Sequence, residues 1–321
     1  MELLEQLTQT DGVSGREKHI CGVISNEILP YVDEVYTDAL GNLIAHKKGT
    51  GKKILFAAHM DEIGVIVTFI DDNGFLRFSN VGGLYREHLL YRKVRFENGV
   101  IGVIGSEEHN KEHKLSKLYI DIGANSREEA EQTVSIGDTA AFIGDLRQIN
   151  NKVISKALDD RIGCYALIQA AREVQRKNDL YFCFTVQEEV GLRGAKTVAH
   201  DIEPDFAVAV DVTDTGDTPK APEMAVGLGK GAAVKVMDRS VLCDVQVRTA
   251  LVALAKKQGI PYQLEVMTDG GTDAGALSLT RSGIKTGGIS IPCRYVHSPA
   301  EMVDLEDVHH AVQLIRAFAA Q

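Results

Sequence analysis

The sequence of 321 residues lacks the features that would direct it to a membrane or to nucleic acid. No apolar run approaches the roughly 18 residues of a membrane-spanning helix, so we expect no membrane partner. Residues 1–9 carry charges and lack the apolar core of a signal peptide. The net charge of −10 argues against nucleic acid or an anionic membrane as the main partner.

Cysteine is scarce and shows no pairing pattern. There are five cysteines, an odd number, and no C-x-x-C pair is present. Three of them lie in apolar runs, where a reduced thiol in the core is the ordinary interpretation. The sequence therefore predicts a reducing compartment, the cytoplasm. The five are Cys21, Cys164, Cys183, Cys243 and Cys293.

The rest of the composition is that of an ordinary globular protein, with 44% hydrophobic and 25% charged residues. The two ends of the chain favour an α/β fold with a mostly parallel sheet. Residues 54–58 form a continuous apolar run, as expected for a strand buried on both faces. Similar runs at 180–186, 206–210 and 286–291 alternate with helical patterns. Near the start, Ser14 with Glu17 three residues later predicts a capping box that begins a helix over 15–29.

The middle of the chain has a different pattern. Short alternating runs follow one another at 64–70, 76–80, 93–96, 100–104, 118–122 and 139–142. Turn signals separate these runs, including the hairpin signal Asn98-Gly99. The pattern predicts a small β-barrel or sandwich, which we interpret as a separate domain inserted into the first. His109 and His113 in this region are interpreted as part of a polar surface loop.

Acidic and histidine side chains follow several of the predicted strands. Glu188 and Glu189 come directly after one apolar run, and on their own they also fit a solvated turn with an acidic helix start. His59 and Asp211 end two further strands, and His297 lies six residues beyond another. Because the carboxyl ends of parallel strands share one edge of a sheet, these side chains are expected to meet there.

Such a cluster suits a two-metal hydrolase. Borderline metals such as zinc take imidazole and carboxylate ligands and leave a position open for water. Two metals about 3.5–4 Å apart share a bridging carboxylate and activate the water that attacks a carbonyl. One carboxylate has to remain free to carry the proton. No serine–histidine or cysteine–histidine pattern of comparable quality is present, so a side-chain nucleophile is not favoured.

The chain resembles the M42 metallo-aminopeptidases over almost its whole length. The motifs that carry the resemblance are residues 12–17 (GVSGRE), 59–64 (HMDEIG), 157–163 (ALDDRIG), 187–191 (QEEVG), 211–214 (DVTD), 217–219 (DTP), 270–273 (GGTD) and 291–298 (IPCRYVHS). Their order and spacing along the chain make this a specific match.

The resemblance implies a role for each site residue. It implies that His59 and Asp211 hold one metal ion, that Glu189 and His297 hold the other, and that Asp159 bridges both. Glu188 is then the general base and later the general acid. The resemblance also implies that Asp61 orients His59, and that the peptide bond between Asp159 and Asp160 is cis.

The resemblance also implies an architecture and an assembly. A phosphorylase/peptidase-like catalytic domain with a mostly parallel sheet comprises residues 1–63 and 155–321, and residues 64–154 form an inserted, barrel-like dimerisation domain. Dimers are expected to build a tetrahedral shell of twelve subunits. Such a homo-oligomer admits short peptides with a free N-terminus and excludes folded proteins.

The expected activity is removal of N-terminal residues from short peptides by two divalent ions. Zinc, cobalt and manganese all accept this ligand set. A related dimetal deacylase or dipeptidase is the nearest alternative. Some family members have been labelled endoglucanases, but glycoside hydrolysis normally needs two free carboxylates. The preferred first residue stays open, since Arg294 and the 270–273 loop fit either the pocket or a structural role.

Overall fold

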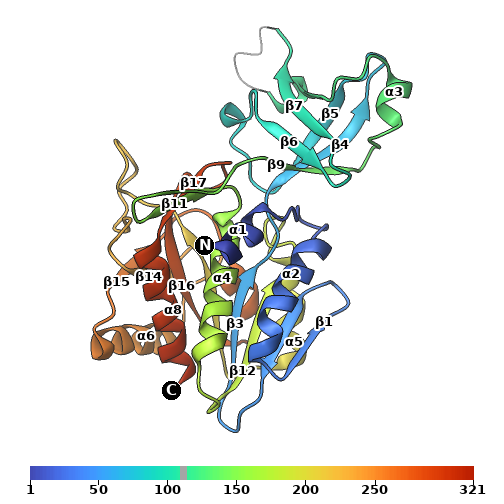
Figure 1. Ribbon diagram of the computed structural model, residues 1–321. Coiled ribbons are helices and arrows are strands. Elements are labelled where there is room, and N and C mark those ends of the chain that lie inside the picture. Colours follow the sequence, from blue (N-terminus) through green and yellow to red (C-terminus); the bar gives the residue numbers. More distant parts are fainter. Residues whose placement is uncertain (109–113) are drawn as a thin grey trace.

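The computed structural model describes residues 1–108 and 114–321, so His109 and His113 lie outside the described residues. A large body built around one sheet carries a smaller barrel above it (Figure 1). Within the described residues, no helix is both long and apolar enough to span a membrane.

An 11-stranded sheet forms the large body. Its main path runs through β1 (Glu34–Thr37), β2 (Leu43–Lys47), β12 (Asp179–Thr185), β3 (Lys53–His59), β13 (Phe206–Thr213), β16 (Lys285–Arg294), β17 (Glu301–Asp304), β11 (Lys152–Ser155) and β10 (Arg147–Ile149). Two further strands, β14 (Ala232–Met237) and β15 (Tyr262–Val266), pair beside β16. The four central strands β12, β3, β13 and β16 are parallel, which confirms the predicted α/β class, whereas the outer strands on this path join antiparallel.

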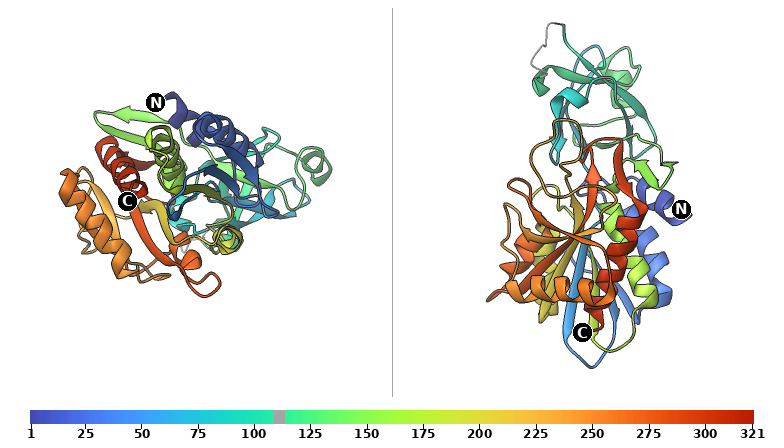
Figure 2. Two further views of the ribbon diagram at one scale, coloured as in Figure 1. Left: turned by 90° about the horizontal axis from the view of Figure 1, so that it is seen from below. Right: turned by 90° about the vertical axis from the view of Figure 1, so that its left-hand side faces the viewer.

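Helices cover both faces of this sheet (Figures 1 and 2). They are α1 (Glu2–Gln9), α2 (Lys18–Ile28), α4 (Leu158–Glu173), α5 (Arg193–Ile202), α6 (Val245–Gln258), α7 (Asp273–Ser278) and α8 (Leu305–Ala319), with a 3-10 turn at Leu29–Tyr31. Phe56 and Ala58 of β3 join the core with α1, α2, α4 and α8, while Leu55 and Ala57 join the core with α5 and α7. The apolar run in β3 is continuous because alternate side chains fill two different cores.

The barrel closes through six strands and has a core of its own. These strands are β4 (Gly64–Ile70), β5 (Leu76–Val81), β8 (Leu118–Asp121), β7 (Ile101–Ser106), β6 (Lys93–Phe96) and β9 (Thr139–Phe142). It also carries α3 (Arg127–Glu131) and two 3-10 turns, Arg86–His88 and Leu115–Lys117. The closed barrel confirms the barrel alternative over a sandwich, and Gly99, with φ of 89°, makes the predicted turn between β6 and β7.

Two local predictions were wrong or incomplete. The helix after Ser14 begins only at Lys18, and Ser14 caps nothing because its hydroxyl donates to Asp61 at 2.6 Å. Glu17 accepts the N–H groups of Gly15 and Gln187 instead of closing a capping box. The sequence analysis did not predict the strands β10, β11 and β17. Each is only three or four residues long, and none of them is a continuous apolar run.

A buried group of charges joins the start of the chain to the loop after β3. Glu62, Lys156 and Arg161 are each at most 2% exposed. Lys156 Nζ lies 2.6 Å from Glu62 Oε2 and 3.1 Å from Asp11 Oδ1, and Arg161 Nη2 lies 3.5 Å from Glu62 Oε1. Arg161 also donates to the carbonyls of Met60, Leu7 and Thr10. The cluster therefore anchors α1 beside the segment that carries His59.

Removing the acidic member of this cluster should be costly. We expect Glu62→Gln to lower the free energy of unfolding by about 3 kcal/mol, because Arg161 then stays buried without a carboxylate and Lys156 keeps only Asp11. Denaturant unfolding of metal-free protein measures the change. Asp145→Asn is the control, since Asp145 and Arg147 form a pair with both side chains about two thirds exposed. It should change stability by less than about 0.5 kcal/mol, and an equal loss in both variants would contradict the expectation.

Candidate metal centre

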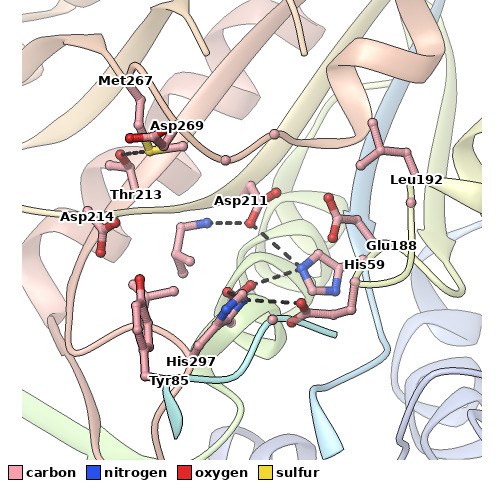
Figure 3. Close-up of a pocket in the computed structure, with 18 residues that line it drawn as sticks. His59, Tyr85, Glu188, Leu192, Asp211, Thr213, Asp214, Met267, Asp269 and His297 are labelled. Carbon is pink, nitrogen blue, oxygen red and sulfur yellow. Dashed lines mark hydrogen bonds and ion pairs between the residues drawn. The ribbon is translucent and has the colours of Figure 1, made fainter. Parts of the chain in front are cut away.

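The predicted site residues meet at one edge of the sheet (Figure 3). His59 ends β3, Asp211 lies near the end of β13, and Glu188 and Glu189 follow β12. His297 follows β16, and Asp159 lies in the first turn of α4. These residues line a cavity of about 420 Å³. Parallel strands bring their carboxyl ends together, which is why residues more than 200 positions apart share one pocket.

One half of the cluster surrounds His59, which is 2% exposed. Its Nε2 atom lies 2.9 Å from Asp159 Oδ1 and 3.8 Å from Asp211 Oδ1. The other half surrounds His297, whose Nε2 atom lies 3.1 Å from Glu189 Oε2 and 3.4 Å from Asp159 Oδ2. The two oxygens of Asp159 thus face different histidines.

Asp61 lies behind His59 and is fully buried. Its Oδ1 atom is 3.4 Å from His59 Nδ1, and the same ring nitrogen is 3.2 Å from the Asp61 carbonyl oxygen. The Asp61 carboxylate also accepts the N–H groups of Glu188 and Glu189, at 3.0 and 3.2 Å. One side chain therefore ties the loop after β3 to the loop after β12.

The backbone around Asp159 is irregular. The peptide bond between Asp159 and Asp160 is cis, as the motif implied. Asp160 is fully buried, and its carboxylate accepts the N–H groups of His59 at 3.2 Å and Gly163 at 3.1 Å. Asp160 therefore links the last residue of β3 to the start of α4.

Glu188 points into the pocket beside His59 and Asp211 (Figure 3). Among the described residues, its carboxylate has no hydrogen-bond partner. Desolvation raises the pKa of Glu188 well above the usual range, and the nearby carboxylates of Asp211 and Asp273 add to the rise. A free carboxyl with a raised pKa in a pocket is suited to accept and release a proton.

The cluster holds more negative charge than its own cations balance. Burial raises the pKa of Asp211 and of Asp160 well above the usual range, and neighbouring carboxylates contribute. Burial lowers the pKa of both histidines, but Asp159 and Asp61 raise that of His59 well above normal, and Glu189 and Asp159 raise that of His297 to about 12. The raised pKa values of these carboxylates and histidines show that the cluster favours the binding of positive charge, either as protons or as a metal ion.

This donor set fits divalent metal ions. Glu189 Oε1 is buried and has no hydrogen-bond partner among the described residues. Ligand atoms lie within 4.8 Å of one another in two groups, His59 with Asp159 and Glu189, and His59 with Asp160 and Asp211. Imidazole and carboxylate together are the donors that zinc and similar metals take. The second group includes Asp160, which the sequence did not single out as a ligand.

The structure adds residues that the sequence did not predict. Glu301 of β17 accepts the N–H groups of Asp159 and His297, each at 2.9 Å. The loop after β5 brings Gly83 and Tyr85 of the barrel to the pocket. A Cβ atom at Gly83 would lie 3.0 Å from His297 Nδ1, so the barrel loop fits tightly against this histidine. None of the motifs named above includes these positions, and only tertiary pairing brings them to the site.

Arg294 and the 270–273 loop, whose roles the sequence left open, have separate outcomes. Arg294 forms a two-pronged ion pair with Asp217, at 3.0 and 2.8 Å, and does not line the pocket. In the 270–273 loop, Gly270 and Gly271 do line the pocket, and Asp273 accepts the hydroxyl of Thr185. Burial raises the pKa of Asp273 to about 6.

Comparisons with known proteins agree with the motifs. A protein of Acetivibrio thermocellus that carries a provisional aminopeptidase name is 55% identical over 318 residues, covering 98% of this chain and 96% of the relative. The solved TET1 peptidase of Pyrococcus horikoshii, described as able to assemble into a tetrahedron or a large octahedral shell, is 38% identical with a TM-score of 0.90, covering 100% of this chain and 99% of its own. A Thermotoga maritima structure described as an endoglucanase is 36% identical with a TM-score of 0.84, and the match covers 98% of this chain and 96% of the Thermotoga chain.

The family model described as M42 glutamyl aminopeptidase matches residues 41–314, which include every predicted site residue. The match covers every strand of the large sheet except β1, together with the barrel and the residues that line the pocket. The chain belongs to the M42 aminopeptidase family.

Proposed function

We propose that the chain is a metal-dependent aminopeptidase that removes N-terminal residues from short peptides. The observation that carries the proposal is the pair of clusters around His59 and His297, which share Asp159 and lie beside the unpaired carboxylate of Glu188. Family membership supports the same peptide chemistry.

For the ligands, we propose that His59 and Asp211 hold one ion, Glu189 and His297 hold the other, and Asp159 contributes to both. The separate contacts of the two Asp159 oxygens support the bridging role. When bound, two divalent ions of zinc, cobalt or manganese supply Lewis-acid chemistry and positive charge.

Within the chain itself, Glu188 is proposed to take a proton from water and to give it to the leaving amine. The Asp61 side chain is proposed to orient the His59 ring through Nδ1, which leaves Nε2 facing Asp159 and Asp211. Asp61 also accepts the N–H groups of Glu188 and Glu189. It is therefore proposed to hold the general base, Glu188, and one metal ligand, Glu189, in position relative to His59.

The nearest alternative is a dimetal deacylase or dipeptidase with the same ligands. A glycoside hydrolase is not favoured, because it normally needs two free carboxylates that flank the glycosidic bond. Near Glu188, Asp211 instead contacts His59 and Glu189 contacts His297. All five cysteines are free thiols, which is consistent with a reducing compartment, and we propose the cytoplasm.

For the architecture, we propose that residues 1–63 and 155–321 form the catalytic domain and that residues 64–154 form an inserted dimerisation domain. The closed barrel with its separate core supports an inserted domain. However, β10 and β11 lie within residues 64–154 and pair with the large sheet, which favours an insert that ends before Arg147. We propose a tetrahedral dodecamer built from dimers. The TET1 peptidase of Pyrococcus horikoshii, described as able to assemble into a tetrahedron or a large octahedral shell, supports a shell-forming assembly.

The function is tested with protein stripped by EDTA and reloaded with zinc, cobalt or manganese. We expect metal-dependent release of the first residue from short peptides with a free N-terminus, and none from the same peptides with an acetylated one. Cleavage of only the acetylated peptides would reassign the chain as a deacylase. Cleavage of neither set by any metal-loaded form would contradict a peptidase role.

The same panel tests the charge of the preferred first residue. Asp214 and Asp269 line the pocket, and no lysine or arginine does so among the described residues. We therefore expect peptides that begin with glutamine to be cleaved faster than matched peptides that begin with glutamate.

Glu188→Gln separates catalysis from metal binding. We expect two metal equivalents to remain by elemental analysis and turnover to fall by about 100-fold or more, because the amide cannot carry the proton. His59→Ala is the comparison variant and should lose one equivalent. Unchanged turnover in Glu188→Gln would remove Glu188 from the mechanism, and full occupancy in His59→Ala would refute its role as a ligand.

The assembly has its own test. Light scattering of the metal-loaded protein should give a mass of twelve 35.0 kDa subunits. A stable monomer or dimer would refute the shell but would leave the peptidase proposal standing.

A further inference from the structure

Glu301 is a buried carboxylate that lies behind the metal centre on β17. It is 1% exposed, and no lysine or arginine of the described residues forms an ion pair with it. Its Oε2 atom accepts the N–H of Asp159, and its Oε1 atom accepts the N–H of His297, both at 2.9 Å. Each oxygen of this single side chain therefore holds the backbone of a different residue of the centre.

Both of these backbones are irregular and need such an acceptor. His297 has φ of 60°, a left-handed conformation that is uncommon for residues other than glycine. Asp159 lies at the start of α4 with non-helical φ of −77° and ψ of 106°. A buried N–H without a partner is costly, and neither group has a strand neighbour to accept its hydrogen bond.

The position of Glu301 links its hydrogen bonds to the spacing of the centre. Asp159 Oδ2 and His297 Nε2 are 3.4 Å apart, and Glu301 joins the two main chains that carry them. We propose that Glu301 is a positioning residue that fixes His297 relative to Asp159 and thereby sets the affinity for the metal ion on the His297 side. The inference rests on the proposed function, since it takes that ion as bound by His297, Glu189 and Asp159.

A glutamate is the side chain that this role requires. Glutamine has the same shape but only one acceptor oxygen, and its NH₂ group would face one of the two N–H donors. Aspartate keeps the charge and both acceptor oxygens but is one methylene shorter, so its carboxylate cannot reach both N–H groups from the same backbone position. Each substitution is therefore expected to release either Asp159 or His297.

The test measures metal affinity, which does not depend on turnover. In Glu301→Gln, competition between protein and a chelator for Zn²⁺ should show the equivalent on the His297 side weakened about 10–100-fold. The other equivalent should weaken less, because it shares only Asp159 with that side. The absorption spectrum of Co²⁺ added stepwise should show the same loss. The unfolding temperature of the metal-free variant is measured in parallel, to separate positioning from a general loss of structure.

Asp304→Asn provides the matched control on the same strand. Asp304 is also buried, and it accepts hydrogen bonds from Asn151, Lys152 and the N–H of Glu306, none of which faces the pocket. This variant should lose thermal stability and keep both metal affinities. A comparable loss of metal in Asp304→Asn would mean that any damage to β17 weakens the centre, which would overturn the proposal.

Two further outcomes decide the matter. If Glu301→Gln does not fold, Glu301→Asp takes its place, with the same expected weakening on the His297 side. Wild-type affinity for both equivalents in a folded Glu301 variant would overturn this inference alone. A wild-type protein that binds no pair of metal ions would instead overturn the proposed function, together with the role assigned to Glu301.

Discussion

Negative charge held away from water at one edge of the sheet is the constraint on which this structure depends. Asp159, Asp160, Asp211 and Asp61 are buried there, and the imidazoles of His59 and His297 lie against three of them, Asp159, Asp211 and Asp61. Isolated carboxylates are expensive to bury, so the arrangement makes physical sense as a receptor for cations. The proposed metal ions therefore complete the charge balance of the fold as well as its chemistry.

The neighbouring elements hold this charge in place through backbone N–H groups. Asp61 accepts N–H groups from the loop after β12, Asp160 accepts one from the end of β3, and Glu301 joins the start of α4 to the loop after β16. Each carboxylate thus connects two segments far apart in sequence. This network keeps the candidate ligand side chains at fixed spacing, which is what a preorganised site needs.

The barrel belongs to the same arrangement, although its core is separate. Its loop after β5 carries Gly83 to His297 and Tyr85 to the rim of the pocket, and Gly82 approaches Glu189. A side chain at Gly83 would push against the histidine ring. The geometry of the candidate metal centre is therefore coupled to the position of the barrel.

By itself, the sequence determined the parallel centre of the sheet, the run of short barrel strands and the strand ends that carry His59, Glu188, Glu189 and Asp211, because these follow from local apolar periodicity. It did not predict β17, the role of Ser14 at Asp61, or the acceptor role of Glu301. Those were decided by tertiary structure, since a short strand or a polar side chain has no local signal that names its distant partner. Which carboxylates face a histidine and which hold a backbone is fixed only when the strand ends meet.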